Sequence, residues 1–186
     1  VMVSPRELEL ENLADQSQTF VNRRFKYTHG YGVAMSSVND FTSEGLPNML
    51  IRGIPPVAKS DDLAVEKPQL YYGTLTRTPA VVNTEELEFD YPAGDANKYI
   101  HYDGTGGVGI GSLWRRFLFG ARFDGSRLFF SGYPRQGSRI LFHREIRDRV
   151  QRIAPFLRLE NAPYIVLADG KLYWIIDAYT VSSRFP

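Results

Sequence analysis

The residues whose spacing best suits chemistry are the glycines of segment 104–111, called the glycine loop below. The stretch Gly-Thr-Gly-Gly-Val-Gly fits the pattern G-x-G-x-x-G, and the serine after the loop is a residue type that begins helices. Backbone N–H groups at such a helix start can bind phosphate or another anion. The sequence therefore offers one candidate anion or ligand site, made of Gly104, Thr105, Gly106, Gly107, Ser112, Arg115 and Arg116. A glycine loop with a purely structural role is the alternative that we favour.

Dinucleotide binding is the narrowest interpretation of this pattern. Asp124 lies 20 residues after Gly104, where an acid that binds a ribose hydroxyl would lie. However, the segment from Lys98 to Asp103 is too polar for the buried strand that should precede the loop, and Asp124-Gly125 has the composition of a turn. The lysine of a Walker loop is also missing. These features argue against a nucleotide, and we expect no cofactor.

The other chemistry-bearing side chains form no recognisable catalytic set. The histidines, His29, His101 and His143, are scattered, so that only folding could gather them around a metal with Asp90 or Asp103. The chain has no cysteine, and its serines lack the G-x-S-x-G pattern. The carboxylate pairs stand in polar, loop-like stretches, at Asp61-Asp62 and Glu85-Glu86. We therefore expect no metal site and no catalytic residue, and an enzyme is the weaker alternative.

The charge of the chain is unevenly distributed. The net charge is only +1, yet residues 112–152 contain ten arginines against Asp124, Glu145 and Asp148. A nucleic-acid partner is not expected, because the domain as a whole is not basic and has no known reading element. Four arginines could instead meet a membrane surface or a protein partner, namely Arg144, Arg147, Arg149 and Arg152. A solvated or internally paired helix face is the alternative that we favour.

Two amphipathic helices would position these residues. The first is expected at about 112–123, where apolar residues recur at helical spacing and form a stripe, at Leu113, Trp114, Phe117, Leu118 and Ala121. The second is expected at about 139–154, with an apolar face at Phe142, Ile146, Val150 and Ile153. Its polar face should carry the ion pairs Glu145–Arg149 and Asp148–Arg152. Aromatic residues make up 13% of the chain, which favours an aromatic-rich core over an aromatic binding surface.

The end of the chain predicts a β-hairpin. The apolar runs 164–168 and 172–176 flank Asp169-Gly170, a pair that suits a two-residue turn with positive φ angles. Short strands, then helices, then a hairpin do not alternate as parallel β-α-β units would, so we expect a single α+β domain over residues 1–186. An exposed loop is expected at 57–68, and the acidic stretch 84–90 is expected at the surface.

No apolar run approaches the roughly 18 residues that cross a membrane. The best candidate, Val108 to Phe123, is interrupted by Arg115 and Arg116. The first residues have neither the basic start nor the apolar segment of a signal peptide. Both ends of the sequence look like cuts within a longer chain, and we expect a fragment.

Several short motifs, taken together, resemble one bacterial family. The motifs are Val21-Asn22-Arg23-Arg24, Tyr27-Thr28-His29-Gly30-Tyr31-Gly32, Asp90-Tyr91-Pro92, Trp114-Arg115-Arg116, Arg147-Asp148-Arg149-Val150 and Trp174-Ile175-Ile176-Asp177-Ala178-Tyr179-Thr180. The family resembled is known only as an uncharacterised protein family of large multi-pass membrane proteins, number one-eight-two in its series. The likeness runs from about Phe20 to Pro186. It implies that the chain is an internal slice of a soluble region that lies outside the cytoplasm, at the cell membrane.

Resemblance and residues together give the following expectation. The chain is a non-catalytic, extracytoplasmic domain of a multi-pass membrane protein, with a role in binding or assembly. Its partners would be other regions of its own parent chain, neighbouring subunits or an anionic membrane surface. The alternative is a domain that binds a small ligand or anion, with or without catalysis, through segment 104–112 and Arg115 and Arg116.

Overall fold

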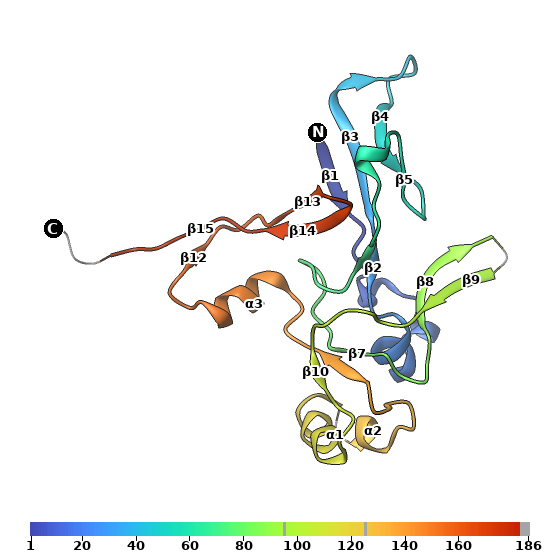
Figure 1. The fold of residues 1–186 in the computed structure, drawn as a ribbon, viewed down its shortest axis with the longest axis vertical. Coiled ribbons are helices and arrows are strands. Elements are labelled where there is room, and N and C mark those ends of the chain that lie inside the picture. The colour runs from blue at the N-terminus through green and yellow to red at the C-terminus, as the bar shows by residue number, and fades with distance from the viewer. Residues whose placement is uncertain (95, 125, 183–186) are drawn as a thin grey trace. The chain divides into compact units, whose positions relative to one another are not determined.

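The structure is a computed structural model that describes residues 1–94, 96–124 and 126–182 (Figure 1). Its contacts divide the chain into two compact units. Unit 1 comprises residues 1–7, 29–76 and those from 145 onward, and unit 2 comprises residues 8–28 and 77–144. Strands and helices occur in both units without β-α-β alternation, which confirms the α+β class. The single domain over residues 1–186 stays a prediction.

Unit 1 is built on a four-stranded antiparallel sheet in the order β1-β3-β4-β5. These strands are β1 (Met2–Pro5), β3 (Val33–Phe41), β4 (Pro47–Arg52) and β5 (Val57–Ala58). Val33 and Met35 alternate along β3 and pack with Ile51 of β4, because successive side chains of a strand point to opposite faces. Residues 29–76 of unit 1 also contain three smaller elements. The strand β2 (Gly30–Tyr31) pairs with β6 (Gln69–Leu70), and η4 (Asp61–Leu63) is a 3-10 helix.

The predicted C-terminal hairpin is confirmed. β13 (Tyr164–Ala168) pairs with β14 (Lys171–Ile175), and Asp169 and Gly170 form the turn with φ angles of 49° and 70°. Ile165 joins the core of unit 1, and the indole N–H of Trp174 donates to the carbonyl of Tyr72 at 3.0 Å. Two further strands, β12 (Arg158–Leu159) and β15 (Ala178–Tyr179), form a separate pair.

Unit 2 has its core around a three-stranded antiparallel sheet in the order β10-β11-β7. Its strands are β7 (Ala80–Val82), β8 (Glu88–Ala93), β9 (Ala96–Ile100), β10 (Val108–Gly109) and β11 (Arg139–Leu141), of which β8 and β9 form a hairpin. Its 3-10 and π-helices are η1 (Leu10–Asn12), η2 (Asp15–Ser17), η3 (Asn22–Lys26) and η5 (Gly120–Asp124). The core consists of Phe25, Val81, Ile110, Leu128 and Ile140.

The first predicted helix is found, although it has two parts. α1 (Leu113–Phe119) continues directly into the π-helix η5, so together they cover almost all of the predicted range. A further short helix, α2 (Ser126–Phe130), was not predicted, since five residues are too few to show a period. Residue 125, and with it the predicted turn after Asp124, lies outside the described residues.

The second predicted helix begins later than expected. α3 spans Ile146–Ile153, whereas residues 139–141 form the strand β11, so the predicted range of 139–154 is wrong at its start. His143 has a φ of 48°, a left-handed conformation that a right-handed helix does not contain. The chain thus leaves β11, turns at His143 and starts α3 only after Glu145. In the described part of the chain, no helix has the length and apolar character of a membrane span.

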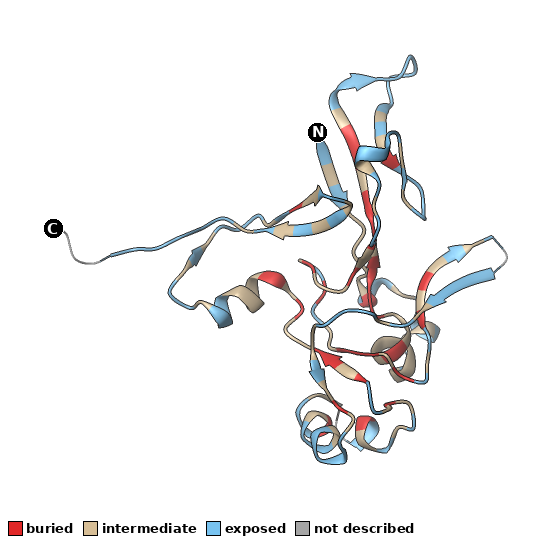
Figure 2. Ribbon diagram, viewed as in Figure 1, coloured by how far each residue is buried: buried red, intermediate tan, exposed pale blue. Residues whose placement is uncertain are grey.

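The segment predicted as an exposed loop, residues 57–68, has some structure of its own. Most of its side chains are exposed, as expected for a surface segment (Figure 2). It nevertheless contains β5 and η4, and Leu63 and Val65 pack against the core of unit 1. Ala58 packs there too and β5 pairs with β4, so this charged stretch is attached to that core at several points.

Glu7 holds the segment that follows β6. Its carboxylate accepts the N–H groups of Thr74 and Leu75 at 2.9 and 2.8 Å. It also accepts the hydroxyl groups of Thr74 and Thr76 at 2.6 and 3.2 Å. Four donors therefore converge on one half-buried carboxylate, an arrangement that stabilises the start of the chain against residues 74–76.

We predict that Glu7→Ala lowers the free energy of unfolding by about 2 kcal/mol, because four hydrogen-bond donors lose a charged acceptor. Urea denaturation of the chain measures this change. The matched control is Glu44→Ala, which removes an exposed glutamate and should change stability by less than about 0.5 kcal/mol. Equal stability of the two variants would contradict the role given to Glu7.

Candidate functional site

One arginine of β11 holds the glycine loop from its carbonyl side. The Nε of Arg139 donates to the carbonyl of Gly106 at 2.6 Å. Its Nη2 donates to the carbonyls of Thr105 and Gly107, each at 2.9 Å. The N–H of Gly106 donates to the hydroxyl of Tyr102 at 2.9 Å. The loop thus turns three carbonyl oxygens toward a cation of its own chain, whereas binding of an anion requires N–H groups.

Only glycine fits at position 107, because both the backbone conformation and the lack of room exclude a side chain. Gly107 has a φ of 79°, which side chains rarely adopt. A Cβ there would lie 2.5 Å from the Cδ2 of Leu141 and 2.7 Å from the carbonyl oxygen of Ile140. This close approach lets β10 pair with β11, and it supports the structural interpretation of the loop. The anion site at residues 104–107 stays a prediction.

The other residues of the predicted anion site lie at the start of α1, and the two arginines among them bind the backbone. Ser112 precedes α1, and its side chain makes no capping hydrogen bond. The Nε of Arg116 donates to the carbonyl of Ile110 at 3.0 Å, and an Nη of Arg115 donates to that of Gly109 at 3.3 Å. The two guanidinium groups therefore bind the carbonyl oxygens of the last residue of β10 and of the residue after it, as Arg139 binds those of the loop before β10.

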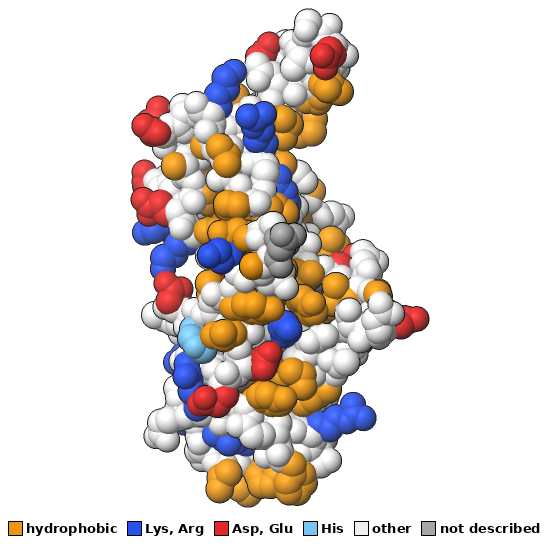
Figure 3. Space-filling view, turned by 90° about the vertical axis from the view of Figure 1, so that its right-hand side faces the viewer, with side chains coloured by type: hydrophobic (Ala, Val, Ile, Leu, Met, Phe, Trp, Pro, Cys, Tyr) orange, Lys and Arg blue, Asp and Glu red, His pale blue; other side chains and the backbone are white. Residues whose placement is uncertain are grey.

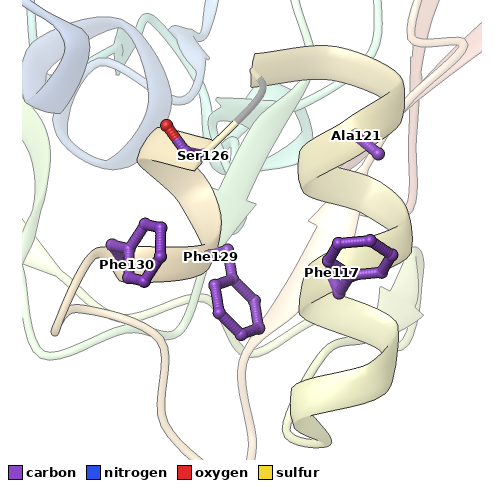
Figure 4. A pocket seen from close by; sticks show the side chains of 5 residues that line it. All are labelled: Phe117, Ala121, Ser126, Phe129 and Phe130. Atoms are coloured by element: carbon purple, nitrogen blue, oxygen red, sulfur yellow. The ribbon is translucent and has the colours of Figure 1, made fainter.

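The apolar stripe of α1 faces solvent. We call it, with the neighbouring end of α2, the α1–α2 surface, made of Leu113, Trp114, Phe117, Leu118 and Phe130, with exposed fractions of 66, 66, 49, 49 and 78%. A pocket of about 350 Å³ opens beside it, lined by Phe117, Ala121, Ser126, Phe129 and Phe130 (Figure 4). Hydrophobic side chains gather at the lower end of Figure 3, where α1 and α2 lie. For these aromatic residues the favoured core interpretation is wrong, and an exposed surface is found.

The arginines predicted as a membrane or partner surface do not share one exposed face. Arg144 is buried, and its guanidinium donates to the carbonyls of Thr28 and Thr78. Arg144 lies inside unit 2, so its assignment to an exposed surface is wrong. It binds carbonyl oxygens, as Arg139 does, and holds together backbone segments that are distant in the sequence.

The other three predicted arginines lie on α3. The guanidinium of Arg149 lies 4.8 Å from the ring centroid of Tyr72, and Arg147 is half-buried. Arg152 donates to both carboxylate oxygens of Asp148 at 2.9 Å, which confirms that predicted ion pair. Whether this face contacts a partner or a membrane stays a prediction.

The predicted Glu145–Arg149 ion pair is replaced by a helix cap. The carboxylate of Glu145 accepts the N–H groups of Arg147 and Asp148 at 3.0 and 2.7 Å. These N–H groups have no acceptor within the helix, so the carboxylate stabilises the start of α3. A spacing of four residues brings side chains together inside a helix. Glu145 lies one residue before α3 begins, so its carboxylate caps the helix instead.

A buried carboxylate was missed by the sequence analysis. Glu88, the first residue of β8, is fully buried and accepts the hydroxyl of Thr28 at 2.6 Å. It also accepts the N–H groups of Asn83 and Tyr102 at 3.1 and 3.0 Å. Thr84 and Asp90 are buried too, so the surface position expected for residues 84–90 is wrong for these three side chains. Only a weak signal was available, the alternation of acids with Leu87 and Phe89.

The histidines lie in different surroundings. His29 is buried with its ring centroid 4.7 Å from that of Tyr71, His101 is exposed, and His143 packs on Phe142. Among the described residues, no group of three His, Asp or Glu side chains could hold a metal ion. The side chain of Asp124, considered above for ribose binding, is outside what the structure describes.

These features define the chain as an α+β protein in which several arginines and the buried Glu88 bind groups of the chain's own backbone. Comparison with known proteins gives its relationship. The Uncharacterised protein family (UPF0182) matches residues 1–186, and the chain belongs to this family.

Curated relatives extend well beyond the matched region. The chain is 47% identical to a UPF0182 protein of Pelotomaculum thermopropionicum over 186 residues and 45% identical to one of Trichodesmium erythraeum over 186 residues. Each match covers all of this chain but only 20% of the relative, so the chain spans about one fifth of their length. No solved structure matches the chain.

We predict that Arg139→Lys lowers the free energy of unfolding by about 2 kcal/mol, because an ammonium group cannot reproduce the planar contacts to three carbonyls. Hydrogen exchange of residues 104–109 should also become faster than in the unmodified chain. The control is Arg115→Lys, which alters one longer hydrogen bond at an exposed position and should leave both quantities almost unchanged. Slow exchange of the loop in the Arg139 variant would show that other contacts hold it.

Proposed function

We infer that this chain is a non-catalytic, extracytoplasmic assembly domain of a larger membrane protein, and that it binds other regions of its parent chain. The observation that carries this proposal is an apolar sheet face left uncovered in unit 1. That face belongs to the β13–β14 hairpin, and its exposed large apolar members are Tyr164, Tyr173 and Ile175.

The hairpin is apolar on both faces but is covered on only one. On the inner face, Ile165, Leu167, Leu172 and Trp174 pack against the core of unit 1. On the outer face, Tyr164 stands opposite Ile175, and Val166 stands opposite Tyr173. Strands with apolar residues on both sides are typical of sheets that are covered on both faces. The sequence of the hairpin therefore fits a position between two layers, of which the structure contains one.

The segments before and after the hairpin show the same shortage of burial. Between residues 151 and 182, only Ile165 is buried, and large apolar side chains at Ile153, Phe156, Tyr179 and Val181 are exposed (Figure 2). Two-stranded pairs such as β12–β15 are marginally stable unless they pack against something further. Since the curated relatives are about five times as long as the matched region, their remaining length supplies candidate covering segments.

The proposal predicts that the outer face of the hairpin is covered in the full-length parent chain. Hydroxyl-radical footprinting should show oxidation of Tyr164 and Tyr173 that is several-fold slower in the parent chain, held in detergent, than in the 186-residue chain. Oxidation of Trp174, which is half-buried in unit 1, should differ much less between the two. Equal oxidation rates for the tyrosines in both proteins would refute the proposal.

A pair of variants separates assembly from folding. The double variant Val166→Ser with Tyr173→Ser should leave the melting temperature of the isolated chain within a few degrees, because the outer face lacks cover there. In the parent chain the same variant should reduce the yield of folded protein. The matched control is Tyr99→Ser, at a tyrosine of β9 that is exposed to a similar degree.

A further inference from the structure

We propose that the α1–α2 surface of unit 2 docks onto the interface of a lipid bilayer that contains anionic lipids. The aromatic side chains would insert among the acyl chains, and the arginines beside them would contact the phosphate headgroups. This surface is distinct from the hairpin face assigned to assembly, and it contains neither Arg144 nor the arginines of α3.

The apolar part of the surface is continuous across the two helices. The rings of Trp114 and Phe117 are stacked with centroids 5.7 Å apart, and Phe117 meets Phe129 of α2 edge to face at 6.0 Å. Phe129 in turn contacts Phe130 at 5.1 Å. Figure 4 shows the rings of Phe117 and Phe129 beside each other among the side chains that line the pocket. A connected aromatic row that stays in water marks a binding site rather than a chance exposure.

The opposite side of this helical segment packs against the core of unit 2. Rotation of α1 about its axis therefore cannot bury the apolar stripe without exposing other apolar side chains. Phe119 and Phe123 pack against the core of unit 2, and Gly120 is buried. The rings of both phenylalanines also contact Phe142, with centroids 5.6 and 5.9 Å apart. Rotation of the helix would expose these three aromatic residues in order to cover others. The outward orientation of Trp114 and Phe117 is therefore a property of the folded unit.

The charge of the same segment is complementary to anionic headgroups. Residues 112–130 contain four arginines, one aspartate and neither lysine nor glutamate. Arg115, Arg122 and Arg127 are exposed, and the guanidinium of Arg122 lies 5.2 Å from the ring centroid of Phe123. Arg115 lies on α1 and Arg122 on η5, which continues α1 directly, so both belong to the same helical segment as the apolar stripe. Arginines at the border of an exposed Trp-, Phe- and Leu-containing face are typical of elements that lie in a bilayer interface.

The pocket and the shortness of the helices favour a bilayer over a protein partner. α1 has seven residues and α2 has five, so neither presents the long groove that receives a helix. The pocket of about 350 Å³ is lined by Phe117, Ala121, Ser126, Phe129 and Phe130, and it suits a flexible acyl chain. Tryptophan is enriched at membrane interfaces because its ring is apolar and its N–H is polar.

Fluorescence of Trp114 tests the proposal directly. Because the chain has only two tryptophans, Trp174→Phe leaves Trp114 as the sole reporter. We expect this protein to bind vesicles of phosphatidylcholine mixed with phosphatidylglycerol, with a blue-shifted emission that brominated lipids quench. Binding should weaken about fivefold for each exposed arginine removed, as in Arg122→Gln with Arg127→Gln. Absence of binding, or emission that brominated lipids do not quench, would overturn the proposal.

Matched variants show whether this surface in particular is responsible. Phe117→Ser with Phe130→Ser should abolish binding, whereas Phe41→Ser with Phe156→Ser, at two exposed phenylalanines elsewhere, should preserve it. Arg77→Gln with Arg158→Gln changes the net charge equally and should have little effect. Circular dichroism and melting temperature establish that each variant is folded. Equal loss of binding in the control variants would refute a specific surface, and footprinting of the hairpin tests the assembly role independently.

Discussion

The contact of Arg139 with three successive carbonyls is the constraint on which the exposed part of unit 2 depends. A loop rich in glycine has few side chains to pack, so its conformation must be set by hydrogen bonds of its backbone. Arg139 supplies them, and the close approach at Gly107 lets β10 pair with β11. Only three residues separate the end of β10 from the start of α1, so the direction of α1 and its exposed face follow from this arrangement.

Arginine has the same role at several places in this chain. Arg144, Arg116 and Arg139 all donate to main-chain carbonyls, although a basic segment first suggests an anionic partner. Guanidinium groups suit this role because they are planar, permanently charged and carry several donors. Much of the positive charge of residues 112–152 is therefore used within the fold. Arg122 and Arg127, next to the α1–α2 surface, differ from these arginines because they are exposed and donate to no backbone carbonyl of the described residues.

Both units leave apolar side chains in water while their cores are small. The buried clusters have five apolar members each, at β3, β4, β6 and β13 in unit 1 and around β7, β10 and β11 in unit 2. The hairpin shows what sequence can predict, since Asp169-Gly170 and the flanking runs fix its turn and register locally. α3 shows the limit, because Phe142 continues the helical period of Ile146 and Val150 although it lies between the strand β11 and the turn at His143.

The sequence by itself determined the α+β class, the hairpin, the presence of α1 and α3, and the family relationship, because these depend on local patterns or on the motifs as a set. Only the tertiary structure decided which side of each pattern is covered. The stripe of α1 has the spacing of a core-facing helix, yet Phe119 and Phe123 take the core positions and Trp114 stays outside. Likewise, the burial of Glu88 depends on groups from separate parts of the chain. The hydroxyl of Thr28 and the N–H groups of Asn83 and Tyr102 all donate to its carboxylate. Periodicity identifies an apolar face, but contacts between distant segments determine what covers it.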